Sequence, residues 1–183
     1  LREITTIVIL LTVSVLTGGR TYERFSYFLY CFGVWDIFYY VGLKVLLNWP
    51  SSLLTWDILF LIPVVWLAPV LAPMVCATTM IIFSGFIFYY HNKGYAVRIN
   101  LLGWSLMSLG ALFILITFIW DYSKIIIQGR FLKSFFSLAT DLHFQSIVTS
   151  YVPGTYNWTL YIFGEFLIFC SLVIFNRSMQ SNR

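Results

Sequence analysis

The sequence predicts an all-α membrane protein in which about five transmembrane helices form a single domain. Two observations predict this class. Of the 183 residues, 60% are hydrophobic and only 10% are charged, with a mean hydropathy of +0.87, whereas a soluble domain carries about a quarter charged residues. In addition, several apolar stretches reach or approach the roughly 20 residues that cross a bilayer as a helix.

The first two predicted spans are residues 1–17 and 25–47. The first ends at Gly18-Gly19-Arg20 and is short for a span, so we expect the native chain to begin upstream with this helix complete. The second has basic residues before it and Asn48-Trp49-Pro50 after it. Its length is sufficient to cross the bilayer with some tilt.

The stretch from residue 53 to residue 90 is too long for one span and too short for two. Its 38 residues would form a helix of about 57 Å, whereas the hydrocarbon core is about 30 Å thick. Pro63, Pro69 and Pro73 lie in its first half, and each removes a backbone donor. We therefore expect residues 53–73 to form a proline-broken segment, re-entrant or interfacial, and residues 74–90 to form the third span.

Residues 99–120 and 158–176 are the fourth and fifth predicted spans. In the fourth, small residues such as Gly103 and Gly110 predict close approach of a neighbouring helix. Residues 121–157, between these spans, mix apolar and charged side chains. We expect an amphipathic loop here, with a helix near residues 131–138 lying in the membrane interface.

Basic residues predict the orientation, because cytoplasmic loops of membrane proteins are enriched in Lys and Arg. With residues 53–73 not crossing, six basic residues fall on one side and four on the other. This division predicts a cytoplasmic C-terminus, with the proline-broken segment on the outer face of a bacterial inner membrane. The basic residues are scattered singly, so we expect membrane lipid and no nucleic acid as a partner.

Four ionisable residues fall inside or beside the apolar stretches, where charge is costly and commonly functional. Lys44 lies near the end of its span and can reach the surface. Asp57 follows a Ser/Thr-rich turn, so we expect it at a helix start. Asp36 and Glu165 lie deep within their spans and are harder to explain structurally.

A tyrosine lies four residues from each deep carboxyl. Asp36 and Tyr40 share a helix face, as do Tyr161 and Glu165. Each tyrosine could satisfy its carboxyl, or another subunit could do so. A proton path through the two carboxyls is the alternative interpretation.

No catalytic or cofactor motif occurs in the sequence, so we expect neither an enzyme nor a bound cofactor or metal. His91 and His143 are the only histidines and favour interfacial positions, with haem or pigment ligation as an alternative. The three cysteines share no ligand spacing and are interpreted as small residues at helix contacts. A lipid-modifying enzyme that uses Asp57 and His143 is a further alternative, but no nucleophile or set of metal ligands accompanies these two residues.

Residues 27–73 are rich in tryptophan and tyrosine, among them Trp56, at several depths, which favours protein–protein contact in the membrane. The runs WDIFYY at residues 35–40 and WPSSLLTWDILFLIP at residues 49–63 resemble a pattern in an uncharacterised family of bacterial integral membrane proteins. The resemblance covers roughly residues 20–75. It implies a bacterial origin and no catalytic residues.

These observations favour a non-catalytic accessory subunit of a larger membrane complex, in an electron-transfer or energy-converting assembly, with other membrane subunits as partners. The alternative is a small transporter or a proton- or ion-conducting protein that uses Asp36 and Glu165. The residues expected to contact partners or to lie as polar groups inside the membrane are Asp36, Tyr40, Lys44, Trp56, Asp57, Tyr161 and Glu165.

Overall fold

Five described helices and a two-stranded hairpin make up the protein in a computed structural model that describes residues 2–61, 64–129, 131, 147, 151 and 153–181. In chain order the elements are α1 (Arg2–Thr17), α2 (Thr21–Leu47), β1 (Trp56–Phe60), β2 (Trp66–Pro69), α3 (Leu71–Asn92), α4 (Leu101–Gln128) and α6 (Trp158–Ser181). Helices α2, α3, α4 and α6 are long and apolar enough to cross a membrane, whereas α1 is apolar but shorter. The predicted all-α membrane class is confirmed.

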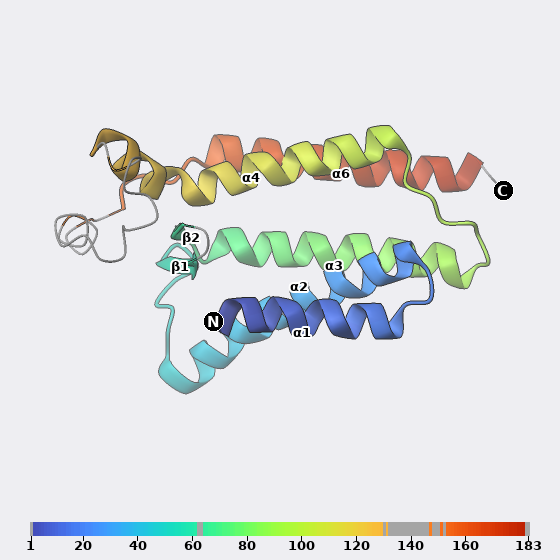
Figure 1. Cartoon of the computed structure of the whole chain (residues 1–183), viewed down its shortest axis with the longest axis horizontal. Coiled ribbons are helices and arrows are strands. Elements are labelled where there is room, and N and C mark those ends of the chain that lie inside the picture. Colours follow the sequence, from blue (N-terminus) through green and yellow to red (C-terminus); the bar gives the residue numbers. More distant parts are fainter. Residues whose placement is uncertain are drawn as a thin grey trace.

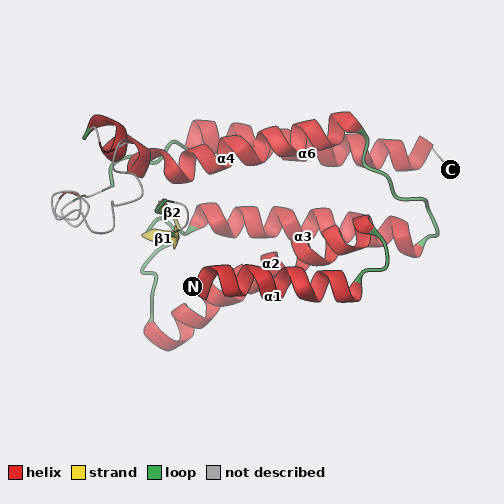
Figure 2. Ribbon diagram, in the orientation of Figure 1, coloured by secondary structure: helices red, strands yellow, loops and turns green. Residues whose placement is uncertain are grey.

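The helices run antiparallel in chain order and form two groups (Figure 1). Helix α4 packs along α6, and α3 packs along α2, which also contacts α1; contacts between α3 and α6 are far sparser. The strands lie at one end of the long helices, here called the hairpin end (Figure 2). The opposite end, called the far end, holds the turn between α1 and α2 and the connection from α3 to α4 (Figure 1).

Glycines allow the closest helix contacts. A Cβ atom on Gly110 of α4 would lie 2.5 Å from the carbonyl oxygen of Gly164 on α6, and one on Gly164 would lie 2.8 Å from that of Gly110. At Gly33 of α2, a Cβ would lie 2.6 Å from the Ala77 carbonyl oxygen on α3. Because lipid tails give helices no hydrophobic reason to associate, such backbone contacts carry much of the packing. The prediction for Gly110 is confirmed.

The helix ends differ from the predicted bounds. Helix α3 begins at Leu71 and not at residue 74, because Pro73 falls in its first turn, where the missing N–H needs no partner. Helix α2 begins at Thr21, where the Glu23 carboxylate accepts from the Gly19 backbone N–H at 2.9 Å. Helix α6 continues to Ser181, beyond the predicted residue 176. Apolar content locates the buried part of a helix and not its polar ends.

Within the proline-broken segment the chain forms an antiparallel hairpin, which the sequence pattern did not predict. Strands β1 and β2 pair Asp57 with Ala68 and Ile58 with Leu67. The Thr55 carbonyl accepts from the Val70 N–H at 2.9 Å, so the hairpin leads directly into α3. The segment does not cross the bundle. Its strand hydrogen bonds pair backbone groups that could not be paired within a helix, because the prolines interrupt one here.

The predicted amphipathic loop is wrong over its first eight residues. Residues 121–128 continue α4 as a helix, with Lys124 and Asp121 paired at 3.8 Å on one face. These charged side chains interrupt the apolar pattern without interrupting the helix, because spacing of three residues places them side by side. The predicted interfacial helix near residues 131–138 falls almost entirely outside the described residues.

Two buried apolar clusters hold the bundle together. One lies at the far end around Phe83, Ile87 and Phe175, where the Phe83 and Phe175 rings stack with centroids 6.0 Å apart. The other lies at the hairpin end and includes Phe118 and Tyr161. The clusters therefore join the two helix groups at both ends of the α3–α6 boundary.

Gly110→Ala should lower the free energy of unfolding by about 1–3 kcal/mol, because the added methyl group has to push α4 and α6 apart. Thermal unfolding in detergent, followed by circular dichroism, measures the effect. Gly85→Ala in α3 is the matched control, because no other atom lies within 4 Å of the position that its new Cβ would occupy. We expect that variant to be unchanged or more stable by up to about 1 kcal/mol. Equal stability of the two variants would contradict the close contact.

Candidate functional site

Glu165 is the polar centre of the boundary between α3 and α6. Its Oε2 atom accepts a hydrogen bond from the Thr79 hydroxyl on α3 at 2.9 Å, and its Oε1 atom lies 3.1 Å from the Tyr161 hydroxyl on α6. Gly164, the preceding residue, fixes α6 against α4. The carboxyl is only partly buried. The expected pairing of Tyr161 with Glu165 at a spacing of four is confirmed.

The Tyr161 hydroxyl has more acceptors around it than it has protons. It lies 2.7 Å from the Ala72 carbonyl oxygen, 3.1 Å from Glu165 Oε1 and 3.3 Å from the sulfur of Cys76. Tyr161 thus links the α3 backbone and the Cys76 thiol to the Glu165 carboxyl.

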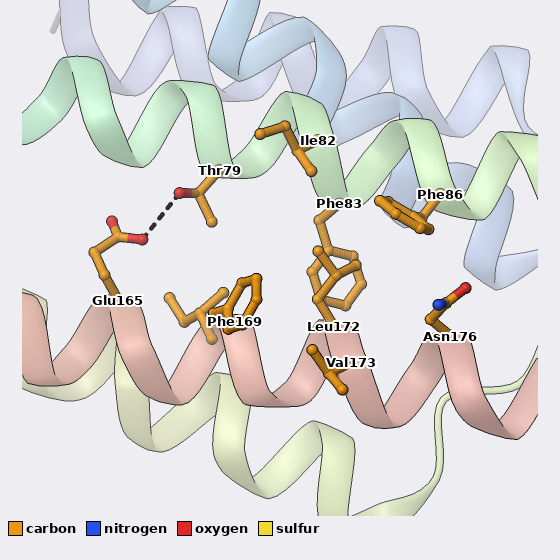
Figure 3. A pocket seen from close by; sticks show the side chains of 10 residues that line it. Thr79, Ile82, Phe83, Phe86, Glu165, Phe169, Leu172, Val173 and Asn176 are labelled. Carbon is orange, nitrogen blue, oxygen red and sulfur yellow. Dashed lines mark hydrogen bonds between the residues drawn. The ribbon is translucent and has the colours of Figure 1, made fainter.

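A cavity of about 380 Å³ lies beside Glu165 between α3 and α6. Figure 3 shows its lining side chains, which extend from the facing sides of the two helices. The described residues that line it are Thr79, Ile82, Phe83, Phe86, Glu165, Ile168, Phe169, Leu172, Val173 and Asn176. Most of them are apolar, and Glu165 is the only ionisable residue among them. The cavity therefore has an apolar body with one group that can carry charge.

Asn176 marks the end of the cavity that is further from the hairpin. Its side-chain oxygen accepts a hydrogen bond from the Tyr90 hydroxyl of α3. Next to Tyr90 on α3, His91 Nδ1 lies 3.2 Å from the Tyr22 hydroxyl and 3.8 Å from the Glu23 carboxylate. His91 is therefore held in a polar cluster at the end of a span, as the interfacial interpretation expected. His143 falls outside the described residues.

Asp57 belongs to a second polar cluster, at the hairpin end. It lies in β1 and not at a helix start, so that expectation is wrong; the prolines that follow favour a hairpin over a helix here. Its carboxylate accepts from the Tyr40 hydroxyl at 2.9 Å and from the Ile58 N–H at 2.8 Å. Burial raises the pKa of Asp57 above its ordinary value, although both hydrogen bonds act in the opposite direction.

Asp36 does not pair with Tyr40 as expected. The hairpin brings Asp57 to the Tyr40 hydroxyl, which donates there. Within the described part of the chain Asp36 shows no hydrogen bond, but it lies close enough to Asp57 for the two carboxyl groups to interact. Asp36 thus belongs to the surroundings of the Asp57 cluster.

The two remaining predicted residues contact their own chain. The Lys44 ammonium donates to the Pro50 carbonyl at 3.0 Å, so it lies near the hairpin end of α2 as expected. Trp56 packs edge-on against Tyr156, with ring centroids 5.9 Å apart. Several aromatic residues that favoured a partner protein therefore already contact one another.

Sequence reasoning missed three functional candidates, which are Cys76, Thr79 and Asn176. Cys76 and Thr79 lie on α3, and nothing in their local sequence indicates that α6 supplies their partners. Asn176 carried a usable signal: it lies 11 residues after Glu165, which is three helical turns and the same face of α6. A polar residue on the same face as an intramembrane carboxyl could have been recognised.

Among the described residues, no group of three or more His, Cys, Asp or Glu side chains could hold a metal ion. No family model, curated protein or solved structure matches the chain. The resemblance to bacterial membrane proteins over residues 20–75 therefore stays a prediction. Function has to be inferred from the geometry of the two polar clusters and the cavity.

Tyr40→Phe should lower the free energy of unfolding by about 1–2 kcal/mol at neutral pH, because a partly buried Asp57 carboxylate loses its hydroxyl donor. The raised pKa of Asp57 means that the folded protein takes up this proton more readily than the unfolded chain. Stability from Asp57 therefore rises as the pH falls through its folded-state pKa, and is lost as the pH rises. The penalty of Tyr40→Phe should be larger at about pH 8 than at about pH 5.

Tyr30→Phe is the control for this measurement, because Tyr30 lies on the same helix and is 46% exposed. We expect its melting temperature to stay close to that of the wild type at both pH values. A Tyr40→Phe penalty that is absent, or that does not depend on pH, would show that Tyr40 does not stabilise the Asp57 carboxylate.

Proposed function

We propose that the protein is a small membrane transporter that moves protons or other cations, with Glu165 as the residue that carries the charge. The observation that supports this proposal is the position of the Glu165 carboxyl: it lines a cavity between two helix groups and accepts a hydrogen bond from Tyr161. Ionisable groups at such positions commonly mark transport pathways.

The polar groups around the cavity offer a route for protons. At the hairpin end, Asp57 and Asp36 lie within electrostatic range of each other. Cys76 contacts Tyr161, which contacts Glu165. On the other side of the cavity, Asn176 and Tyr90 continue towards the far end. The cavity itself separates the two halves of this route, and it has room for water or a transported cation.

The two helix groups also favour movement of the kind that transport requires. Helices α4 and α6 pack tightly together, as do α2 and α3, whereas α3 and α6 share few contacts. Rocking of one rigid group against another around a central site is a common way to open a site alternately to the two sides. Glu165 lies at this boundary.

We further propose that this transport occurs in a bacterial inner membrane with the far end in the cytoplasm. Arg20 and Arg24 follow α1, Lys93 and Arg98 follow α3, and Arg177 lies near the end of α6. These five basic residues all belong to the far end. Enrichment of basic residues on one side supports this orientation.

Proton flux into liposomes tests the role of Glu165. The purified protein is reconstituted with a pH-sensitive dye inside, and a potassium gradient with valinomycin supplies the driving force. Glu165→Gln should reduce the flux by about tenfold or more, because an amide cannot take up the proton. Asp36→Asn should slow the flux by a smaller factor, since Asp36 lies outside the hydrogen-bonded cluster around Glu165.

A pair of adjacent threonines provides a matched control for the flux assay. Thr79 donates to Glu165, whereas Thr78 is exposed and donates to the Met74 carbonyl of its own helix. Thr79→Val should lower the flux and Thr78→Val should leave it unchanged. If the wild type is no faster than empty liposomes, or Glu165→Gln is as fast as the wild type, the transport proposal is wrong.

A second candidate function is that of an accessory subunit in an electron-transfer or energy-converting membrane complex. The observation that favours it is the exposure of aromatic residues of α2, where Tyr30, Phe38 and Tyr39 are 46%, 67% and 45% exposed. Aromatic residues of this kind are enriched where proteins contact one another. Membrane lipid would cover these side chains in the absence of a partner.

Native purification in a mild detergent tests the second candidate. We expect the chain to migrate with other membrane proteins at fixed stoichiometry, as measured by mass spectrometry of the intact particle. A visible absorption spectrum of the same particle shows whether those partners carry haem or pigment. A chain that migrates alone and colourless would count against the accessory role.

A further inference from the structure

The side chains that line the cavity restrict the chemistry of what can bind there. Three phenylalanines, Phe83, Phe86 and Phe169, face the cavity together with aliphatic side chains of α3 and α6 (Figure 3). Glu165 lies towards one end and Asn176 at the other. Their separation of 11 residues along α6 corresponds to about 16 Å. The cavity thus offers an apolar, aromatic groove with acid at one end.

Several classes of ligand do not suit this groove. An anion would be repelled by the Glu165 carboxylate, and no basic residue lies among the described lining side chains to balance its charge. A bare metal ion requires several oxygen ligands, which the apolar walls do not supply. A neutral hydrocarbon chain would leave the carboxyl unused. A cation with an apolar body matches both features, because aromatic faces also attract positive charge.

We propose that the cavity binds a lipophilic organic cation, with its positive charge beside Glu165 and its apolar body directed along Phe169 towards Asn176. This inference rests on the proposed transport function and specifies its substrate class. The cavity volume of about 380 Å³ falls within the range of small-molecule sites. Thr79 and Tyr161 hold the carboxyl in place at the cavity wall.

In the bound state the positive charge of the cation balances the negative charge of the Glu165 carboxylate, so the occupied site carries no net charge. The other titratable groups around Glu165 are Cys76 on α3, Tyr161 on α6 and Tyr156 before α6.

Binding of tetraphenylphosphonium to the purified protein in detergent tests the inference, with tetraphenylborate as a probe of the same shape and opposite charge. Benzyltrimethylammonium serves as a smaller cation. We expect at least one cation to bind about tenfold or more tightly than tetraphenylborate. Isothermal titration calorimetry measures the affinity of each probe.

Two variants separate the charge from the apolar groove. Glu165→Gln should weaken binding of the cation about tenfold or more. Phe169→Ala should weaken binding of the cation about fivefold, because it removes an aromatic wall and keeps the acid. Phe169 is 59% exposed, so this variant is expected to fold. Thr78→Val is the control and should bind as the wild type does.

The outcomes distinguish this inference from the proposed transport function. If neither cation binds, or if tetraphenylborate binds as tightly, the substrate class is wrong. Unchanged cation affinity in Glu165→Gln would likewise overturn it. In each of these cases, proton flux that depends on Glu165 would leave the transport proposal standing. If neither flux nor binding were observed, the transport proposal and the proposed substrate class would both be wrong.

Discussion

The contact between Gly110 and Gly164 determines where the polar centre of the protein can lie. At this point the backbones of α4 and α6 approach so closely that neither glycine has space for a side chain. Glu165 follows directly and is turned away from α4, towards Thr79 on α3 (Figure 3). A helix pair held by backbone contact is stiff, so the position of the carboxyl is fixed by packing rather than by the carboxyl itself.

The structure weakens the argument that the deep carboxyls of Glu165 and Asp36 need a partner subunit. In the sequence, Glu165 and Asp36 were unexplained charges that another subunit could satisfy. In the fold, Glu165 has two hydroxyl partners on its own chain. Asp36 has Asp57 as an acidic neighbour. The hydrogen bonds to Glu165 support a role inside this protein for that residue, and the exposed aromatic residues of α2 are the feature that still favours a complex.

The sequence predicted the helices well because their apolar content reports directly on the bilayer. It predicted the pair Tyr161–Glu165 because a spacing of four along one helix is a local property. It could not predict the bond from Thr79 or the approach of Cys76, since these depend on which helices become neighbours. Asp57 was misplaced for a related reason: a short hairpin with three prolines nearby has a weak local pattern, and its strands are defined by pairing with each other.

The connection between α3 and α4 has a consequence for the two helix groups that it joins. Residues 93–100 are the direct link between groups whose facing helices, α3 and α6, share few contacts. A tether this short keeps the two groups at a high effective concentration, so their interface need not be strong to re-form after each separation. If transport separates the groups, the short tether favours re-formation of the α3–α6 contacts and of the two apolar clusters that cross this boundary.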